Sequence, residues 1–198
     1  MATDLPTIKP VLTMWQTAIF AGVVTADHWV PWADDVILRM RHSPMWVLMM
    51  SVSGDRDALE QNLKGAYQEF DLPHDEHPFY PFYMGYRVNM LCGGQISAKQ
   101  MLEDRWIHPE DHSFALEYFL PTFFDEWHKD VCEEEELWEI AYRLGATDAQ
   151  ITRAFAYIFS DRARDAAEAL DWLINYSADY LVRMGDDPRL AHVIDGVG

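Results

Sequence analysis

Residues 22–26 read Gly-Val-Val-Thr-Ala, and this segment has the composition of a joint between two helices. A glycine adopts the left-handed conformation that ends one helix, and a hydroxyl side chain caps the start of the next. The same spacing recurs at residues 94–98, Gly-Gln-Ile-Ser-Ala, and a version one residue shorter occurs at residues 145–148, Gly-Ala-Thr-Asp. Short joints make consecutive helices pack as antiparallel neighbours. They predict an all-α fold, either a multi-helix bundle or a short α-solenoid-like array.

Outward from these joints, capping residues, glycines and prolines divide the chain into about nine or ten helices. We expect them at about residues 10–21, 26–41, a short and mostly buried helix after Ser43-Pro44, 55–70, 83–91, 98–107, 113–129 with a break or kink at Pro121, 133–144, 148–159 and 162–184. Apolar residues at helical spacing predict the N-terminal core. They are Trp29, Trp32, Val36, Ile37 and Met40, then Met45, Trp46, Leu48 and Met49.

The segment 71–82 contains three prolines and therefore predicts a loop. Residues 1–198 are expected to form a single all-α domain, or two lobes, 1–75 and 80–198, joined by this loop. The N-terminus lacks a cationic segment followed by an apolar one, and no apolar run reaches the length of a membrane span. Cys92 and Cys132 form no CxxC pair, and each is expected to be a small buried side chain. These features predict a soluble cytoplasmic protein without a cofactor.

The chain is strongly acidic, with 33 acidic against 15 basic residues and a formal net charge of -18. Because binding to a nucleic-acid backbone depends on lysine and arginine, direct nucleic-acid binding is not expected. Hydrophobic residues make up 49% of the chain, enough to form a core, so a disordered acidic tail is excluded. The charge favours a basic protein partner, and most of it lies in residues 100–198, which hold 22 acidic and 8 basic residues.

The expected helix 162–184 places acidic and aromatic residues together on the side opposite its core stripe. They are Asp161, Asp165, Glu168, Trp172, Tyr176 and Asp179. A tryptophan and a tyrosine ringed by carboxylates have the composition of a protein-binding hot spot. The alternative is that another helix covers these rings and makes them part of the core.

A second acidic segment runs from Asp125 to Glu139, with a net charge of -7 from eight acidic residues and Lys129. Its helix is expected to point Glu135 and Glu139 outward, with Trp138 and Tyr142 on its flank. The repeated pairing of rings with carboxylates indicates a second binding surface. A solvated charge run, in which the first glutamates interact with the helix dipole, is the alternative.

Four histidines form the only clusters with metal-ligand chemistry: His74 and His77, and His108 and His112. The first pair lies in the proline-rich segment without the i, i+4 helical placement of a zinc motif, and Pro109 favours a helix start between the second pair. No metal is therefore expected. Phosphate-binding, nucleophile-elbow and kinase patterns are absent from the sequence, so an enzyme is not favoured, although a site of paired carboxylates stays open.

The opening of the chain resembles small helical bacterial proteins, some of which are grouped with immunity proteins of polymorphic toxin and contact-dependent inhibition systems. The resemblance spans about residues 20–65 and lies in the Gly22–Thr25 joint, Trp32-Ala33-Asp34, Ile37, Ser43-Pro44, Trp46-Val47-Leu48, Asp57, Leu59 and Leu63. It implies a non-enzymatic protein that binds a toxin effector domain and blocks it, and a nuclease toxin would suit the acidic charge. A helical adaptor or regulatory module, or a small metal-dependent enzyme using the four histidines, are the alternatives.

Overall fold

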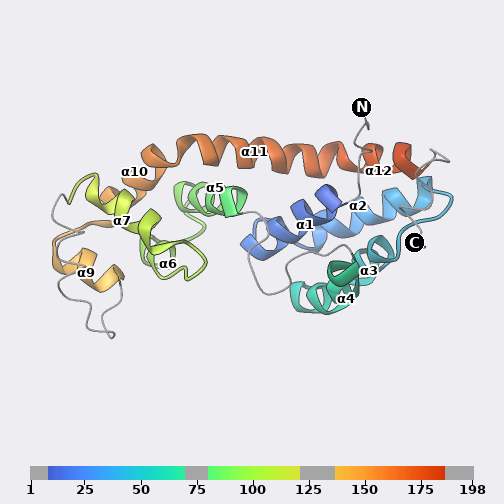
Figure 1. The fold of residues 1–198 in the computed structure, drawn as a ribbon, viewed down its shortest axis with the longest axis horizontal. Helices are drawn as coiled ribbons and strands as arrows, with labels where there is room; N and C mark the ends of the chain where they lie inside the picture. The colour runs from blue at the N-terminus through green and yellow to red at the C-terminus, as the bar shows by residue number, and fades with distance from the viewer. Residues whose placement is uncertain (1–8, 70–79, 121–136, 186–198) are drawn as a thin grey trace, which may run out of the picture. The chain divides into compact units, whose positions relative to one another are not determined.

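The computed structural model describes residues 9–69, 80–120 and 137–185. Within these residues the chain forms eleven helices and no strand, which confirms the all-α prediction. The helices are α1 (Lys9–Ala21), α2 (Ala26–Arg39), α3 (Met45–Val52), α4 (Arg56–Glu69), α5 (Tyr80–Cys92), α6 (Ala98–Leu102), α7 (Pro109–Glu117), α9 (Leu137–Arg143), α10 (Asp148–Ile158), α11 (Ser160–Asn175) and α12 (Ser177–Gly185) (Figure 1).

All three glycine joints are confirmed. Gly22, Gly94 and Gly145 have φ angles of 78°, 69° and 90°, in the left-handed region that a side chain would strain. Ser97, three residues after Gly94, caps α6, because its Oγ accepts a hydrogen bond from Gln100 N at 3.1 Å. Thr147, two residues after Gly145, caps α10 in the same way, and its Oγ1 accepts from Gln150 N at 3.3 Å. Local sequence therefore determines where α5 and α9 end and where α6 and α10 begin.

The chain divides into two compact units. Unit 1 comprises Met1–Phe79 together with Glu168–Gly198, and unit 2 comprises Tyr80–Ala167. The division at residue 80 falls at the proline-rich segment that was expected to separate two lobes. The expected second lobe, 80–198, differs from unit 2 because α12 packs against α2 and so belongs to unit 1. The other boundary falls inside α11, between Ala167 and Glu168.

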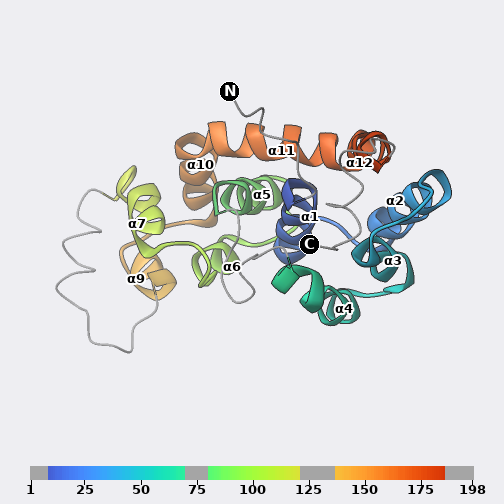
Figure 2. The same cartoon turned by 45° about the vertical axis from the view of Figure 1, so that its right-hand side comes forward.

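Unit 1 is built around tryptophan side chains. The ring of Trp15 in α1 contacts Trp32 in α2 with centroids 4.9 Å apart, and Trp32 stacks with Trp46 in α3 at 5.8 Å. All three rings are buried, and Trp29 donates its indole N–H to Ser53 O at 2.9 Å. Helix α3 packs against both α2 and α4 (Figure 2). The large apolar area of these rings joins the first helices into one body.

Unit 2 depends on one close approach between helices. Helix α5 crosses α11 at Gly85, where an added Cβ would lie 2.1 Å from Arg162 O and 2.6 Å from Ala166 Cβ. Asn89, one turn further along α5, donates its side-chain N–H to Ala163 O at 2.8 Å. Helix α10 packs against α5, α6 and α7, and its Phe155 is fully buried.

Several expected helix boundaries differ from the structure. The expected helix 162–184 is two helices, α11 and α12, separated at Tyr176, and α7 begins at Pro109 rather than at Ser113. Proline fits the first turn of a helix because its missing N–H is not needed there, which explains the earlier start of α7. Residues 70–79 and 121–136, which include the proline-rich segment, Pro121 and Cys132, lie outside the described residues.

Two burial predictions were wrong. Met45 and Leu48 of α3 were expected in the core but are exposed, since they lie on the side opposite Trp46, Val47 and Met50. Cys92 was also expected to be buried and is exposed, because it ends α5 next to the glycine joint. No helix in the described part of the chain combines the length and the apolar composition that crossing a membrane requires.

Candidate functional site

The six acidic and aromatic residues predicted around α11 belong to two units. Asp161 and Asp165 lie in unit 2, whereas Glu168, Trp172, Tyr176 and Asp179 lie in unit 1. Both carboxylates in unit 2 form ion pairs with Arg164, whose NH1 lies 3.0 Å from Asp161 Oδ1 and whose NH2 lies 3.0 Å from Asp165 Oδ1. Their negative charge is therefore partly compensated within the same helix.

The unit 1 part forms a surface that we name the aromatic–acidic face, made of Glu168, Asp171, Trp172 and Tyr176. The break between α11 and α12 does not disrupt it, because Tyr176 N still donates to Trp172 O at 2.9 Å. Tyr176 is 55% exposed. Trp172 is half-buried, and its ring contacts Tyr180 at 5.8 Å between centroids in an edge-on arrangement. The indole is thus held in place by a neighbour while part of it faces solvent.

Two carboxylates lie on this face. Glu168 and Asp171 are exposed, and neither forms an ion pair with a lysine or arginine of the described residues. Asp171 Oδ1 accepts a hydrogen bond from Asn175 Nδ2 at 2.8 Å, which orients the carboxylate without neutralising it. Asp171 was missed in the sequence, although it lies three residues after Glu168 and so on the same side of the helix.

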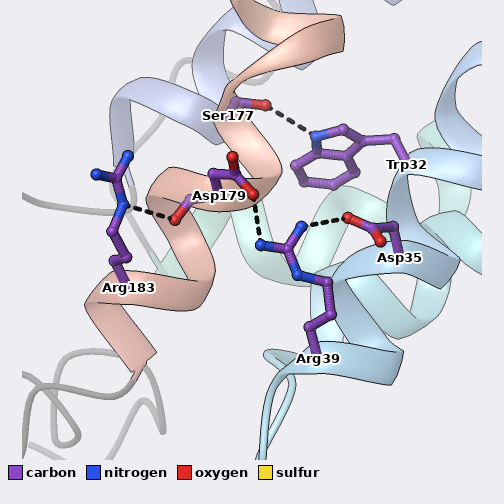
Figure 3. A network of polar contacts seen from close by, with 6 residues as sticks. All are labelled: Trp32, Asp35, Arg39, Ser177, Asp179 and Arg183. Carbon is purple, nitrogen blue, oxygen red and sulfur yellow. Dashed lines mark hydrogen bonds and ion pairs between the residues drawn. The ribbon is translucent and has the colours of Figure 1, made fainter.

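Asp179 has a different environment, shown in Figure 3. Its carboxylate forms an ion pair with Arg39 NH2, and Arg39 NH1 lies 2.7 Å from Asp35 Oδ2. Hydrogen bonds to Asp179 and Asp35 raise the pKa of the Arg39 guanidinium. Arg183 Nε donates to the backbone oxygen of Asp179 at 3.1 Å. Asp179 therefore links α12 to α2 and offers less free charge to a partner than Glu168 or Asp171.

Beneath this ion pair, a buried hydrogen bond fixes α12 on α2. Trp32 Nε1 donates to Ser177 Oγ at 2.8 Å (Figure 3). Ser177 Oγ in turn donates to Leu173 O. Ser177 is fully buried at the start of α12. The position of the aromatic–acidic face is thus set by contacts to α2, which lies about 140 residues earlier in the chain.

Part of the second predicted surface lies outside the described residues, namely Glu135 and residues 125–136. Trp138, Glu139 and Tyr142 of α9 are half-buried. The Lys99 ammonium lies 3.7 Å from the centroid of the Trp138 ring, a cation–π contact within unit 2. Tyr142 Oη donates to Asp148, and burial together with this carboxylate raises the pKa of Tyr142 to about 12. Both rings of this surface therefore contact polar groups of their own chain.

A group of exposed aromatic rings in unit 2 was not predicted. Phe114, Tyr118 and Tyr157 are each more than half exposed, and the rings of Tyr118 and Tyr157 lie 5.0 Å apart. Phe114 and Tyr118 are four residues apart, so they lie on one side of α7. The spacing was available in the sequence, but only the packing of α7 on α10 brings Tyr157 beside them.

His108 and His112 have different environments. His108 is exposed and its ring lies 4.3 Å from that of Tyr80, whereas His112 is buried with Nε2 3.0 Å from Met101 O. Burial lowers the pKa of His112 to about 4, against a backbone hydrogen bond that raises it. His74 and His77 lie outside the described residues. Within the described ranges, no three His, Cys, Asp or Glu side chains gather closely enough to hold a metal ion.

Two carboxylates in unit 2 are held by tyrosine and arginine. Asp104, which is buried, accepts from Tyr83 Oη at 2.7 Å and pairs with Arg87 Nε at 2.6 Å. Asp111 accepts from Tyr80 Oη at 2.6 Å and from Arg162 NH1 at 3.0 Å. Each carboxylate is thus held by a tyrosine and an arginine of its own unit, an arrangement that suits a structural anchor.

Comparison with protein-family models, with curated proteins and with solved structures found no match to this chain. Functional inference therefore depends on the geometry described above.

Proposed function

We propose that this chain is a non-enzymatic binding protein of the immunity type, which captures a basic toxin effector domain through its aromatic–acidic face. The proposal depends on one observation: Tyr176 is 55% exposed beside the half-buried ring of Trp172, next to two carboxylates that no lysine or arginine of the described residues pairs with. Exposed rings within a polar rim are typical of residues that contribute most of the binding energy at protein interfaces.

The charge distribution supports a cationic partner. A net charge of -18 attracts a basic domain over several ångströms and speeds its association, while the rings would slow its dissociation once contact is made. A nuclease is a suitable target because its substrate groove is cationic. Exposed carboxylates such as Glu168 and Asp171 are able to occupy such a groove in place of phosphates.

A cation–π contact within the chain shows how an indole ring can bind a cationic side chain. The Lys99 ammonium sits over the Trp138 ring at 3.7 Å, so an indole already contacts a lysine within this protein. Trp172 presents the same type of ring on the aromatic–acidic face, where no lysine or arginine of the described residues contacts it in this way. A lysine or arginine of the partner fits that position.

The test is capture from cells of the native host, using tagged wild-type protein and the variant Tyr176→Ala. A matched control is Tyr157→Ala, because this exposed tyrosine belongs to unit 2 and is not one of the residues of the aromatic–acidic face. The expected result is a basic protein that wild type and Tyr157→Ala retain and Tyr176→Ala loses. Co-expression should then relieve growth inhibition by that protein. Equal recovery by all three proteins would contradict the proposal.

A helical adaptor remains the second candidate, because a different surface favours association with another protein. Helix α3 exposes apolar side chains that lie outside the aromatic–acidic face. Their arrangement leads to a separate inference.

A further inference from the structure

Helix α3 is apolar apart from Ser51, although one side faces solvent. Its eight residues, Met-Trp-Val-Leu-Met-Met-Ser-Val, contain no charged side chain. Met45, Leu48 and Val52 are 65%, 37% and 75% exposed. Their i, i+3, i+7 spacing places them on one side of the helix, which we name the α3 face. A helix with this composition is normally covered all round, so the α3 face has the properties of an interface.

Charges of opposite sign flank the two ends of the α3 face. Arg41 lies four residues before Met45, and Asp55 and Asp57 lie three and five residues after Val52. These three side chains are exposed, and Arg56, which lies between Asp55 and Asp57, is paired with Glu60 at 2.9 Å. Among the described residues, neither Arg41 nor Asp57 forms an ion pair, whereas Asp55 Oδ1 accepts a hydrogen bond from Ala58 N at 2.8 Å. Along the chain, a cationic side chain therefore precedes the α3 face and acidic side chains follow it.

This order is the reverse of the one that the dipole of α3 favours. The N-terminal end of a helix carries partial positive charge and attracts anions, and the C-terminal end attracts cations. Here Arg41 precedes the N-terminus and Asp55 follows the C-terminus. A second α3 in antiparallel orientation would bring an acidic end to each cationic end and would correct the mismatch at both.

We propose that the α3 face binds a second copy of this chain, with the two α3 helices antiparallel about a two-fold axis. In such an isologous interface each contact occurs twice, because residue i of one copy meets residue j of the second copy and residue j of the first meets residue i of the second. Leu48 would lie near the axis, Met45 would meet Val52 of the second copy, and Arg41 would face Asp57 of the second copy. A parallel pair would instead place like charges together. The interface is separate from the aromatic–acidic face, so the proposal goes beyond the function proposed above.

The first experiment measures self-association of the full chain by light scattering and sedimentation equilibrium. The α3 face is small, so we expect a monomer–dimer equilibrium with a dissociation constant on the order of 1–50 μM. Val52→Glu should raise this constant by at least about 30-fold, because a carboxylate would be buried against Met45 of the second copy. The control Tyr157→Glu alters an equally exposed residue of unit 2 and should leave the constant unchanged.

The second experiment exchanges the two charges. Arg41→Asp and Asp57→Arg should each raise the dissociation constant by about 5–10-fold, because each puts like charges opposite one another at both ends. The double variant Arg41→Asp with Asp57→Arg should return to within about 3-fold of wild type. Circular dichroism and thermal unfolding of every variant show that the fold is retained.

The double variant is expected to recover a dissociation constant near that of wild type only if Arg41 of one copy faces Asp57 of the other. A wild-type chain that stays monomeric up to about 200 μM would overturn the proposal. The proposal would also be overturned if Val52→Glu left the dissociation constant of the dimer unchanged. The same holds if the double variant raised this constant by as much as the two single substitutions together. These results leave the proposed function untouched, because that function is tested by Tyr176→Ala.

Discussion

Trp32 and Ser177 are 145 residues apart in the chain and share a buried hydrogen bond of 2.8 Å between the indole Nε1 and the serine Oγ. This contact holds α12 on α2 and thereby positions Trp172 near the end of α11 and Tyr176, which follows α11 directly. Ser177→Ala leaves the indole N–H buried without an acceptor, so we expect the free energy of unfolding to fall by about 1–3 kcal/mol. Chemical denaturation measures the change.

A double-mutant cycle separates the hydrogen bond from other effects of this substitution. Trp32→Phe removes the same bond together with part of the ring packing against Trp15 and Trp46. The double variant should lose less than the sum of the two single losses, because the shared bond is counted twice in that sum. If the loss of unfolding free energy in the double variant equalled the sum of the two single losses, the Trp32–Ser177 hydrogen bond would not contribute to stability.

Gly85, the single glycine of α5, has no room for a side chain. Because an added Cβ would lie 2.1 Å from Arg162 O, Gly85→Ala must push α5 away from α11. We expect a loss of about 3 kcal/mol or more in the free energy of unfolding. Gly54→Ala is the matched control, since no atom lies within 4 Å of its added Cβ, and it should change stability by less than about 1 kcal/mol. Similar stabilities of the two variants would argue against the close approach.

The protein should lose stability in mild acid because of His112. Its pKa is lowered to about 4 in the folded chain, from 6.5 for an unperturbed histidine. As the pH falls below 6.5, the unfolded state takes up a proton that the folded state does not, so the free energy of unfolding decreases until the pH reaches about 4. The contribution from this residue is roughly 3 kcal/mol over that interval.

His112→Gln tests this pH dependence, because glutamine offers an N–H to Met101 O but does not titrate. Urea unfolding at a series of pH values between neutral and acidic gives the slope for each protein. The variant should be less stable at neutral pH but should lose less stability on acidification than wild type. If the free energy of unfolding fell with pH equally steeply in both proteins, His112 would not contribute to the loss of stability in acid. Titration of carboxylates alone would then account for acid unfolding.

Replacing single carboxylates by amides should slow association with the partner more where the carboxylate has no cationic partner among the described residues than where it is already paired. We expect Glu168→Gln and Asp171→Asn each to slow association with the captured partner by about 2–5-fold at low salt, with little effect on dissociation. Asp179→Asn should have a smaller effect, because its carboxylate already pairs with Arg39. Stopped-flow association rates at several ionic strengths provide the measurement. A larger effect from Asp179→Asn than from Glu168→Gln would contradict the assignment of free and paired charges.

The sequence was sufficient for the parts of the fold that local interactions determine. The left-handed glycines at 22, 94 and 145 and the caps Ser97 and Thr147 act within a few residues, so their pattern predicted the joints correctly. The exposed side of α3 could not be predicted, because Met45 and Trp46 are equally apolar in sequence and only packing against α2 and α4 distinguishes them.

The candidate site was predicted in composition but not in its charge balance. Exposure of Tyr176 follows from the helical spacing of α11. The pairing of Asp179 with Arg39 joins residues 140 positions apart, and the contact of Lys99 with Trp138 joins two separate helices. Such partners depend on tertiary packing, and helical periodicity carries no information about them.

The proposal of partner capture is tested most directly by the affinity of the captured basic protein for wild type, Tyr176→Ala and Tyr157→Ala, measured by isothermal titration calorimetry. We expect Tyr176→Ala to weaken binding by at least about 30-fold, equivalent to about 2 kcal/mol, and Tyr157→Ala to change it by less than about 2-fold. Wild-type affinity of the Tyr176→Ala variant would contradict the aromatic–acidic face as the binding surface.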